Sequence, residues 1–171
     1  MGAPKEEPLA TSDADLSWSP NTEAVDEISV TLNALLADLF TLYLKTKNFH
    51  WHVCGPQFRD YHLLFDEQAD QIFDALDRIA ERVRKVGGST IRSVEHVLRL
   101  ARLRGNDAER VSALDMLGEL RRDNWKLAEF LRDAHLICTD YVDVASANVL
   151  QTLIDEAEKR VWFLTESMHS T

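Results

Sequence analysis

The chain has 171 residues, which suits a single domain, and 45% of them are hydrophobic, so a sizeable core can form. Its formal net charge of −10 argues against binding nucleic acid through the overall field, and no apolar run approaches the roughly 20 residues of a membrane span. The N-terminus is acidic and lacks the basic-then-apolar pattern of a signal segment, so we expect a cytoplasmic protein without a membrane partner.

The first part of the chain divides into a tail and a long helix. Residues 1–19 carry Pro, Ser, Asp and Glu without periodicity, and we expect a mobile acidic tail ahead of one domain over residues 20–171. A first helix is predicted from near Pro20–Thr22 to about Val53, because apolar residues recur there at helical spacing. This stripe comprises Ile28, Leu32, Leu35, Leu36, Leu39, Leu42, Tyr43 and Phe49.

A second long helix follows a short break. The segment Cys54–Pro56 interrupts the pattern, and Pro56 suits the first residue of a helix. The helix is predicted from about Gln57 to Val86, where Gly87-Gly88 ends it. Its apolar stripe comprises Phe58, Tyr61, Phe65, Ala69, Ile72, Leu76, Ile79, Val83 and Val86.

The second half of the chain completes a bundle. Residues 89–110 form a long connection whose amphipathic middle, Ser93 to Leu103, is expected to be a short helix. A third long helix is predicted over about Ser112 to Cys138, with a capping box from Ser112 to Asp115, and a fourth over about Asp143 to Met168. Four long helices with one helical crossover predict an all-α four-helix bundle of ferritin-like connectivity.

Four candidate metal ligands share one arc of the second helix. Taking His62 as the origin, Asp66, Asp77 and Glu81 fall at about 40°, 60° and 100° around the helix axis. They flank the apolar stripe, whereas solvated charges would scatter over the opposite face. A lone His-x3-Asp or Asp-x3-Glu pair is usually a solvent-exposed pair, but the shared arc favours a site. Imidazole with carboxylates is the usual ligand set of non-haem iron.

The axial spacing of these ligands predicts a site between two chains. The pair His62/Asp66 and the pair Asp77/Glu81 are centred about 15 residues apart, which is roughly 22 Å along a helix. One metal ion cannot contact both pairs of the same chain, because ligand bonds are near 2 Å long. Two copies packed antiparallel about a twofold axis near Gln71-Ile72 would bring one pair against the other.

His50, at the edge of the stripe on the first helix, is the predicted fifth ligand. His52 lies about 200° from it around the helix, so both cannot serve one ion, and we expect His52 on the surface or facing a pore. Asp70 lies on the same arc of the second helix as the four candidate ligands. It either helps feed iron to the site or is simply a solvated acid.

The same residues resemble the signature of the Dps family, the DNA-binding proteins from starved cells. The similar segments are His50-Trp51-x-Val53-x-Gly55-x-x-Phe58, His62-x3-Asp66 and Asp77-x3-Glu81-Arg82. The resemblance implies a hollow homododecamer with ferroxidase centres across twofold interfaces, formed by His50, His62 and Asp66 of one chain and Asp77 and Glu81 of the other. It further implies that Fe²⁺ is oxidised, commonly by hydrogen peroxide, with dioxygen as the other oxidant. A ferric mineral would then be stored in the cavity, which protects against oxidative damage.

The resemblance also suggests roles for three further residues. Trp51 would relay electrons or quench radicals beside the centre, although an interface aromatic is the plainer interpretation. Asp140 and Asp143 precede the fourth helix, where the family lines an iron-entry pore at a threefold axis, and rings of acids select cations.

The tails depart from those of family members that bind DNA, which often carry Lys/Arg-rich tails. Residues 1–27 contain one basic residue, Lys5, against seven acids: Glu6, Glu7, Asp13, Asp15, Glu23, Asp26 and Glu27. Neutralising phosphate is the main source of non-specific DNA affinity, so DNA binding is not expected. Iron oxidation and storage is therefore favoured over a nucleoid-compacting function, and over a metal-free scaffold in which five ligands would coincide without reason.

Overall fold

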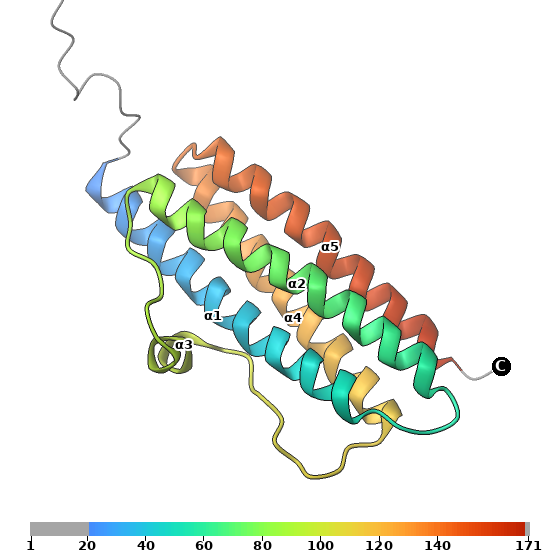
Figure 1. The fold of residues 1–171 in the computed structure, drawn as a ribbon. Helices are drawn as coiled ribbons and strands as arrows, with labels where there is room; N and C mark the ends of the chain where they lie inside the picture. Colours follow the sequence, from blue (N-terminus) through green and yellow to red (C-terminus); the bar gives the residue numbers. More distant parts are fainter. Residues whose placement is uncertain (1–20, 170–171) are drawn as a thin grey trace, which may run out of the picture.

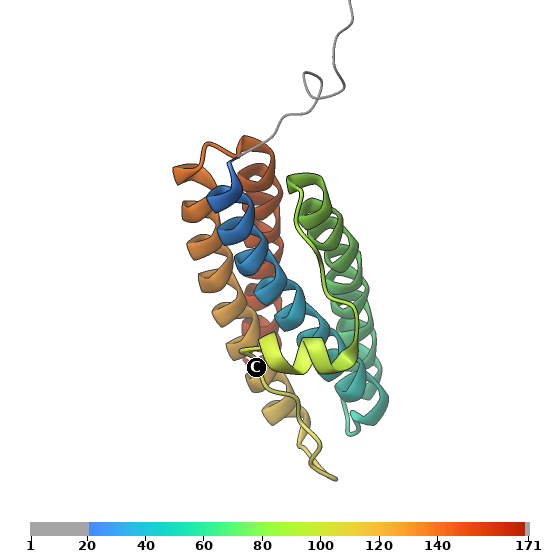
Figure 2. The same ribbon diagram turned by 90° about the vertical axis from the view of Figure 1, so that its left-hand side faces the viewer.

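The computed structural model describes residues 21–169, and within them the chain is entirely helical apart from turns and loops. The helices are α1 (Thr22–His52), α2 (Phe58–Val86), α3 (Val94–Leu100), α4 (Ala113–Asp140) and α5 (Val144–Met168). The four long helices run side by side, and α3 lies across the flank of the bundle (Figures 1 and 2). The predicted all-α bundle with a helical crossover is confirmed, whereas the predicted tail over residues 1–19 lies outside the described residues.

Local capping explains where most helices begin and end. The side chain of Asn21 accepts a hydrogen bond from the Ala24 N–H at 2.8 Å, and that of Ser112 accepts one from Asp115 N–H at 3.2 Å, as the capping pattern predicted. Gly87 ends α2 in the left-handed conformation, at φ 105°, which glycine adopts without strain.

The start of α2 lies one residue after the predicted Gln57 and two after Pro56, which suited the first position of a helix. The helix begins at Phe58 and not at Pro56, because Gly55 turns the chain at φ 117° and its carbonyl accepts a hydrogen bond from the Phe58 N–H at 3.0 Å. Phe58 was also expected in the apolar stripe, yet its side chain is 46% exposed. It lies in the first turn of the helix, and its ring packs on that of His62 with centroids 5.1 Å apart.

The two predicted stripes otherwise form the centre of the core. On α1 all the predicted stripe residues are buried except Tyr43, which is partly buried. On α2 the predicted stripe residues between Phe65 and Val86 are all buried. Helix α1 packs against both α2 and α4, and α5 packs against α4 and α2. This arrangement places the turn that joins α1 to α2 at one end of the bundle, beside the end of α5, where the hydroxyl of Tyr61 donates to the carbonyl of Ser167 at 3.2 Å.

Helix α1 is more apolar than the sequence analysis recognised. An 18-residue stretch of it has a mean hydropathy of 1.3, which by length and composition alone would suffice to cross a membrane. The expectation that no apolar run approaches a membrane span concerned uninterrupted runs, and in α1 these stay short because Asn33, Asp38 and Lys45 interrupt them. Of that stretch, 56% is buried inside the bundle, and the core helix of a four-helix bundle meets the same criterion.

A buried carboxylate fixes the crossover to the bundle. Asp38 on α1 is fully buried, and its two oxygens accept hydrogen bonds from the N–H of Arg102 at 2.6 Å, the N–H of Leu103 at 2.9 Å and Nε of Arg102 at 2.8 Å. These bonds hold the backbone after α3 out of the helical path. For this reason α3 ends at Leu100, three residues before the predicted end.

We predict that Asp38→Asn lowers the free energy of unfolding by about 3 kcal/mol, because an amide NH₂ replaces the oxygen that accepts from Nε of Arg102, which also loses its counter-ion. Guanidinium chloride unfolding followed by circular dichroism measures the change. The matched control is Asp133→Asn at an exposed position of α4, where a change within about 0.5 kcal/mol is expected. Equal stability of the two variants would contradict the anchoring role of Asp38.

Candidate metal centre

Two histidines are joined by reciprocal hydrogen bonds at the end of the bundle where the chain turns from α1 into α2. Nδ1 of His50 lies 2.8 Å from the carbonyl oxygen of His62, and Nδ1 of His62 lies 2.9 Å from the carbonyl oxygen of His50. The rings are stacked, with centroids 3.9 Å apart and planes inclined by 25°. The reciprocal bonds tie the two helices together on both sides of their turn.

These bonds also set the chemistry of the rings. A carbonyl oxygen can only accept, so each Nδ1 carries the hydrogen, and Nε2 is the nitrogen that has the lone pair in the neutral ring. A histidine whose Nδ1–H is held by a carbonyl and whose Nε2 is free has the form in which histidine usually binds a metal. His50 and His62 are therefore pre-oriented as ligands.

Asp66, one turn beyond His62 on α2, adds a carboxylate to the pair. Its Oδ1 lies 3.6 Å from Nε2 of His50 and 2.6 Å from Nζ of Lys47, and its side chain is 43% exposed. The hydrogen bond from Lys47 is the main cause that lowers the pKa of Asp66, helped by the charges of the nearby histidines and opposed by partial burial. The carboxylate is thus held ionised, the form that binds a cation.

Asp77 and Glu81 form a second group, farther along α2. Both are exposed, and with Ala80 and Thr90 they line an open hollow of the surface. The Lys85 ammonium lies 2.6 Å from the Glu81 carboxylate, and this hydrogen bond lowers the pKa of Glu81. The straight helix keeps this group about 22 Å from the first, as the residue spacing predicts.

Within residues 21–169 of one chain, no group of three or more His, Cys, Asp or Glu side chains is close enough to hold one metal ion. Among the predicted ligands, His50 stacks on His62 and faces Asp66, so the trio His50, His62 and Asp66 lies at the same end of the bundle. A metal centre built on this trio needs ligands from beyond it.

The remaining predicted residues have different surroundings. Trp51 is 59% exposed beside His50, and Asp70 and Asp140 are exposed. Asp143 is only 2% exposed: its carboxylate caps α5 by accepting from the Ser146 N–H at 3.0 Å, and it lies 3.5 Å from the Arg82 guanidinium. Of the two residues predicted for a pore, Asp140 is thus the one whose side chain is exposed in the single chain.

His52 is exposed, as expected, and its ring bonds the Asn48 carbonyl at 2.8 Å. Lys47 is a further residue of this site that was not among the predicted ones. The available signal was its position three residues before His50, which puts both on one face of α1.

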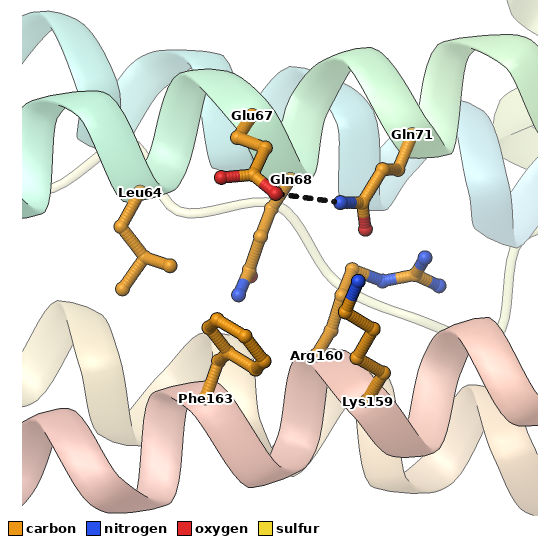
Figure 3. A pocket seen from close by; sticks show the side chains of 7 residues that line it. All are labelled: Leu64, Glu67, Gln68, Gln71, Lys159, Arg160 and Phe163. Carbon is orange, nitrogen blue, oxygen red and sulfur yellow. Dashed lines mark hydrogen bonds between the residues drawn. The ribbon is translucent and has the colours of Figure 1, made fainter.

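A small cavity between α2 and α5 is separate from these residues (Figure 3). Its lining includes the buried side chains of Gln68 and Arg160, which extend into the space between the helices. Nε of Arg160 donates to Oδ1 of Asn124 at 2.6 Å, and burial lowers the pKa of the guanidinium to about 10. None of the five predicted ligands lines this cavity, which is part of the polar core.

The bundle with its helical crossover and the paired histidines facing a carboxylate define the class of ferritin-like proteins. Comparison with known proteins agrees, since residues 30–170 match the ferritin family, described as a ferritin-like domain. The chain is 40% identical over 135 residues to a low temperature-induced protein of Nostoc sp., covering 78% of this chain and 75% of that protein. It is 33% identical over 137 residues to a DNA protection during starvation protein of Brevibacillus brevis, covering 80% and 91%.

A solved structure of Dps from Thermosynechococcus elongatus superposes with a TM-score of 0.84 at 27% identity, covering 88% of this chain and 95% of that one. Within the ferritin-like class, the chain belongs to the Dps-type mini-ferritins.

Proposed function

We propose that this protein oxidises Fe²⁺ at centres shared by two chains and stores the ferric product inside a hollow dodecameric shell in the cytoplasm. The observation that carries the proposal is the stacked and reciprocally hydrogen-bonded pair His50 and His62, in which Nε2 of His50 lies 3.6 Å from Oδ1 of the ionised Asp66. Two imidazoles and carboxylates suit ferrous iron and, as harder oxygen ligands are added, the ferric product as well.

The proposed reaction balances with hydrogen peroxide as oxidant. Two Fe²⁺ ions each lose one electron, and one peroxide molecule takes up both electrons and two protons to give two molecules of water. Dioxygen is the alternative oxidant. Consuming ferrous iron together with peroxide removes both reactants that generate hydroxyl radicals, which is how such a protein would limit oxidative damage.

The second half of each centre would come from a partner chain. In an antiparallel pair of α2 helices about a twofold axis near Gln71-Ile72, His62 and Asp66 of one chain lie level with Glu81 and Asp77 of the other. Ile72 itself faces its own core, so the contact would be made by its exposed neighbours. Three large apolar side chains of α2 support a buried contact, because each is about half exposed in the single chain: Phe58, Leu63 and Phe73.

Further residues have supporting roles in this proposal. Trp51, next to His50, would pass electrons or quench radicals formed at the centre, and its exposure in the single chain is also consistent with an interface aromatic. Asp140, exposed at the turn before α5, is the better candidate for an iron-entry pore. Asp70 lies one turn from Asp66 on α2 and is a candidate for feeding iron inward.

We predict that the purified protein assembles into a dodecamer held by antiparallel α2 contacts. Multi-angle light scattering measures the mass directly, starting from the chain mass of 19.5 kDa. A stable monomer or a plain dimer at micromolar concentration would contradict the proposed shell.

The shared centre is tested by mixing two damaged chains. One carries His62→Ala with Asp66→Ala, and the other carries Asp77→Ala with Glu81→Ala. Each variant alone is expected to lose most rapid Fe²⁺ oxidation, because every centre then lacks half of these ligands. When the two are refolded together, half of the twofold pairs are mixed, and each mixed pair has one intact centre. About a quarter of wild-type activity is therefore expected to return.

A centre within one chain predicts no recovery, since each chain keeps its own lesion in any partnership. Mass spectrometry verifies that the shells contain both chains, and shells refolded from one variant are the control. Mixed shells that stay inactive would rule out the shared centre.

We also predict no retardation of duplex DNA at 150 mM salt without added divalent cations. The acidic residues of the N-terminal region repel phosphate, and no basic tail offsets them. The name of the Brevibacillus brevis relative speaks of DNA protection, which iron removal alone would provide. An electrophoretic mobility shift measures the binding, and clear retardation would favour a nucleoid-compacting function instead.

A further inference from the structure

Lys47 already occupies the carboxylate that the proposed centre needs. Its ammonium lies 2.6 Å from Oδ1 of Asp66, the same oxygen that faces Nε2 of His50 at 3.6 Å. The Lys47 side chain is only 18% exposed, so the ion pair is partly shielded from solvent and its geometry is defined. A metal ion that His50 and Asp66 bind through this oxygen would compete with the ammonium for it, because two cations held at one oxygen repel each other.

A second carboxylate is positioned to receive the displaced ammonium. Asp70 follows Asp66 by four residues on α2, which puts the two carboxylates on one face about 6 Å apart along the axis. Asp70 is exposed and forms no hydrogen bond or ion pair with any residue in 21–169. Its negative charge contributes, with that of Asp66, to raising the pKa of Lys47, which places it within electrostatic reach of the ammonium.

We propose that Lys47 is an internal counter-ion that occupies Asp66 in the empty centre and moves to Asp70 when a divalent metal binds. Both side chains keep their charges throughout, and only the partner of the ammonium changes. The inference rests on the proposed function, because it assumes that Asp66 is a metal ligand. It assigns Lys47 and Asp70 as positioning residues that set how tightly the centre binds its first ion.

The exchange of Lys47 between Asp66 and Asp70 changes the affinity of the centre for metal in a defined direction. In the empty protein the centre can bind metal only in the fraction of molecules whose Lys47 is away from Asp66. The apparent dissociation constant for the metal is therefore the intrinsic constant divided by this fraction. The Asp70 carboxylate attracts the Lys47 ammonium away from Asp66, which increases the fraction of binding-competent molecules and lowers the apparent dissociation constant. In the empty centre the Lys47 ammonium also balances the negative charge of the Asp66 carboxylate, which would otherwise lack a counter-charge.

Isothermal titration with Co²⁺ under nitrogen at 150 mM salt tests the proposal on the assembled protein. Lys47→Met, which keeps the side-chain length and removes the charge, is expected to bind Co²⁺ about tenfold more tightly. Lys47→Arg should bind no more tightly than wild type, because it retains a cation. Lys126→Met, at an exposed position of α4, is the matched control and should leave the affinity unchanged.

Asp70→Asn separates movement of Lys47 from a direct action on iron. In the wild-type background it is expected to weaken Co²⁺ binding several-fold, while in the Lys47→Met background it should have little effect. An equal loss in both backgrounds would mean that Asp70 acts on the incoming ion itself and would overturn the exchange. Weaker or unchanged binding by Lys47→Met would overturn the counter-ion role altogether.

The variant with His62→Ala and Asp66→Ala supplies the reference for Co²⁺ bound elsewhere in the shell. If wild type binds no more Co²⁺ than this variant, there is no centre at these residues, and the proposed function fails together with the inference. If wild type binds more but Lys47→Met is not tighter, only the inference fails.

Discussion

The reciprocal hydrogen bonds between His50 and His62 are the interaction on which the rest of the candidate site depends. They join the end of α1 to the beginning of α2, so the geometry of the ligands is inherited from the packing of the bundle and not from a flexible loop. The same two bonds fix the ring tautomers, because a carbonyl oxygen accepts and cannot donate. Asp66 then needs only to lie one helical turn beyond His62 to complete the group.

A rigid helix imposes the second constraint. Asp77 and Glu81 are held on α2 at a fixed distance from His62 and Asp66, and no loop movement within one chain can bring the two pairs together. The exposed apolar residues Phe58, Leu63 and Phe73 lie on the same helix as both pairs. The two candidate ligand pairs and the apolar surface that would join two chains therefore lie on a single helix, so under the proposed function chain association and metal binding would depend on the same helix.

Much of this molecule could be predicted from the sequence, and the exceptions have physical causes. Apolar periodicity at 3.6 residues per turn identified α1 and α2, because burial of the apolar stripe is what stabilises each helix. The end of α3 escaped prediction because it is set by Asp38, which is 64 residues from Arg102 in the sequence. Asp143 caps α5 and is buried against Arg82, a contact that spacing alone cannot reveal.

The candidate ligands were easier to identify than their surroundings. Histidines and carboxylates on one arc leave a pattern in the sequence, whereas the partner of Lys47 depends on the angle at which α1 and α2 pack. A lysine on a helix surface is usually solvated, so composition and spacing gave no reason to pair it with Asp66. Charged residues that balance a site are in general less visible than the ligands, because no fixed spacing links the two.

The division of the ligands between distant parts of α2 has a consequence for the order of events in the cell. Under the proposed function, a newly made chain holds only half of each of two centres and cannot begin the chemistry by itself. Ferric ions, which precipitate when released into neutral water, would be formed only after the enclosing walls exist. Iron oxidation would then require assembly. A chain that fails to assemble would not oxidise iron, so no ferric product would form outside a shell.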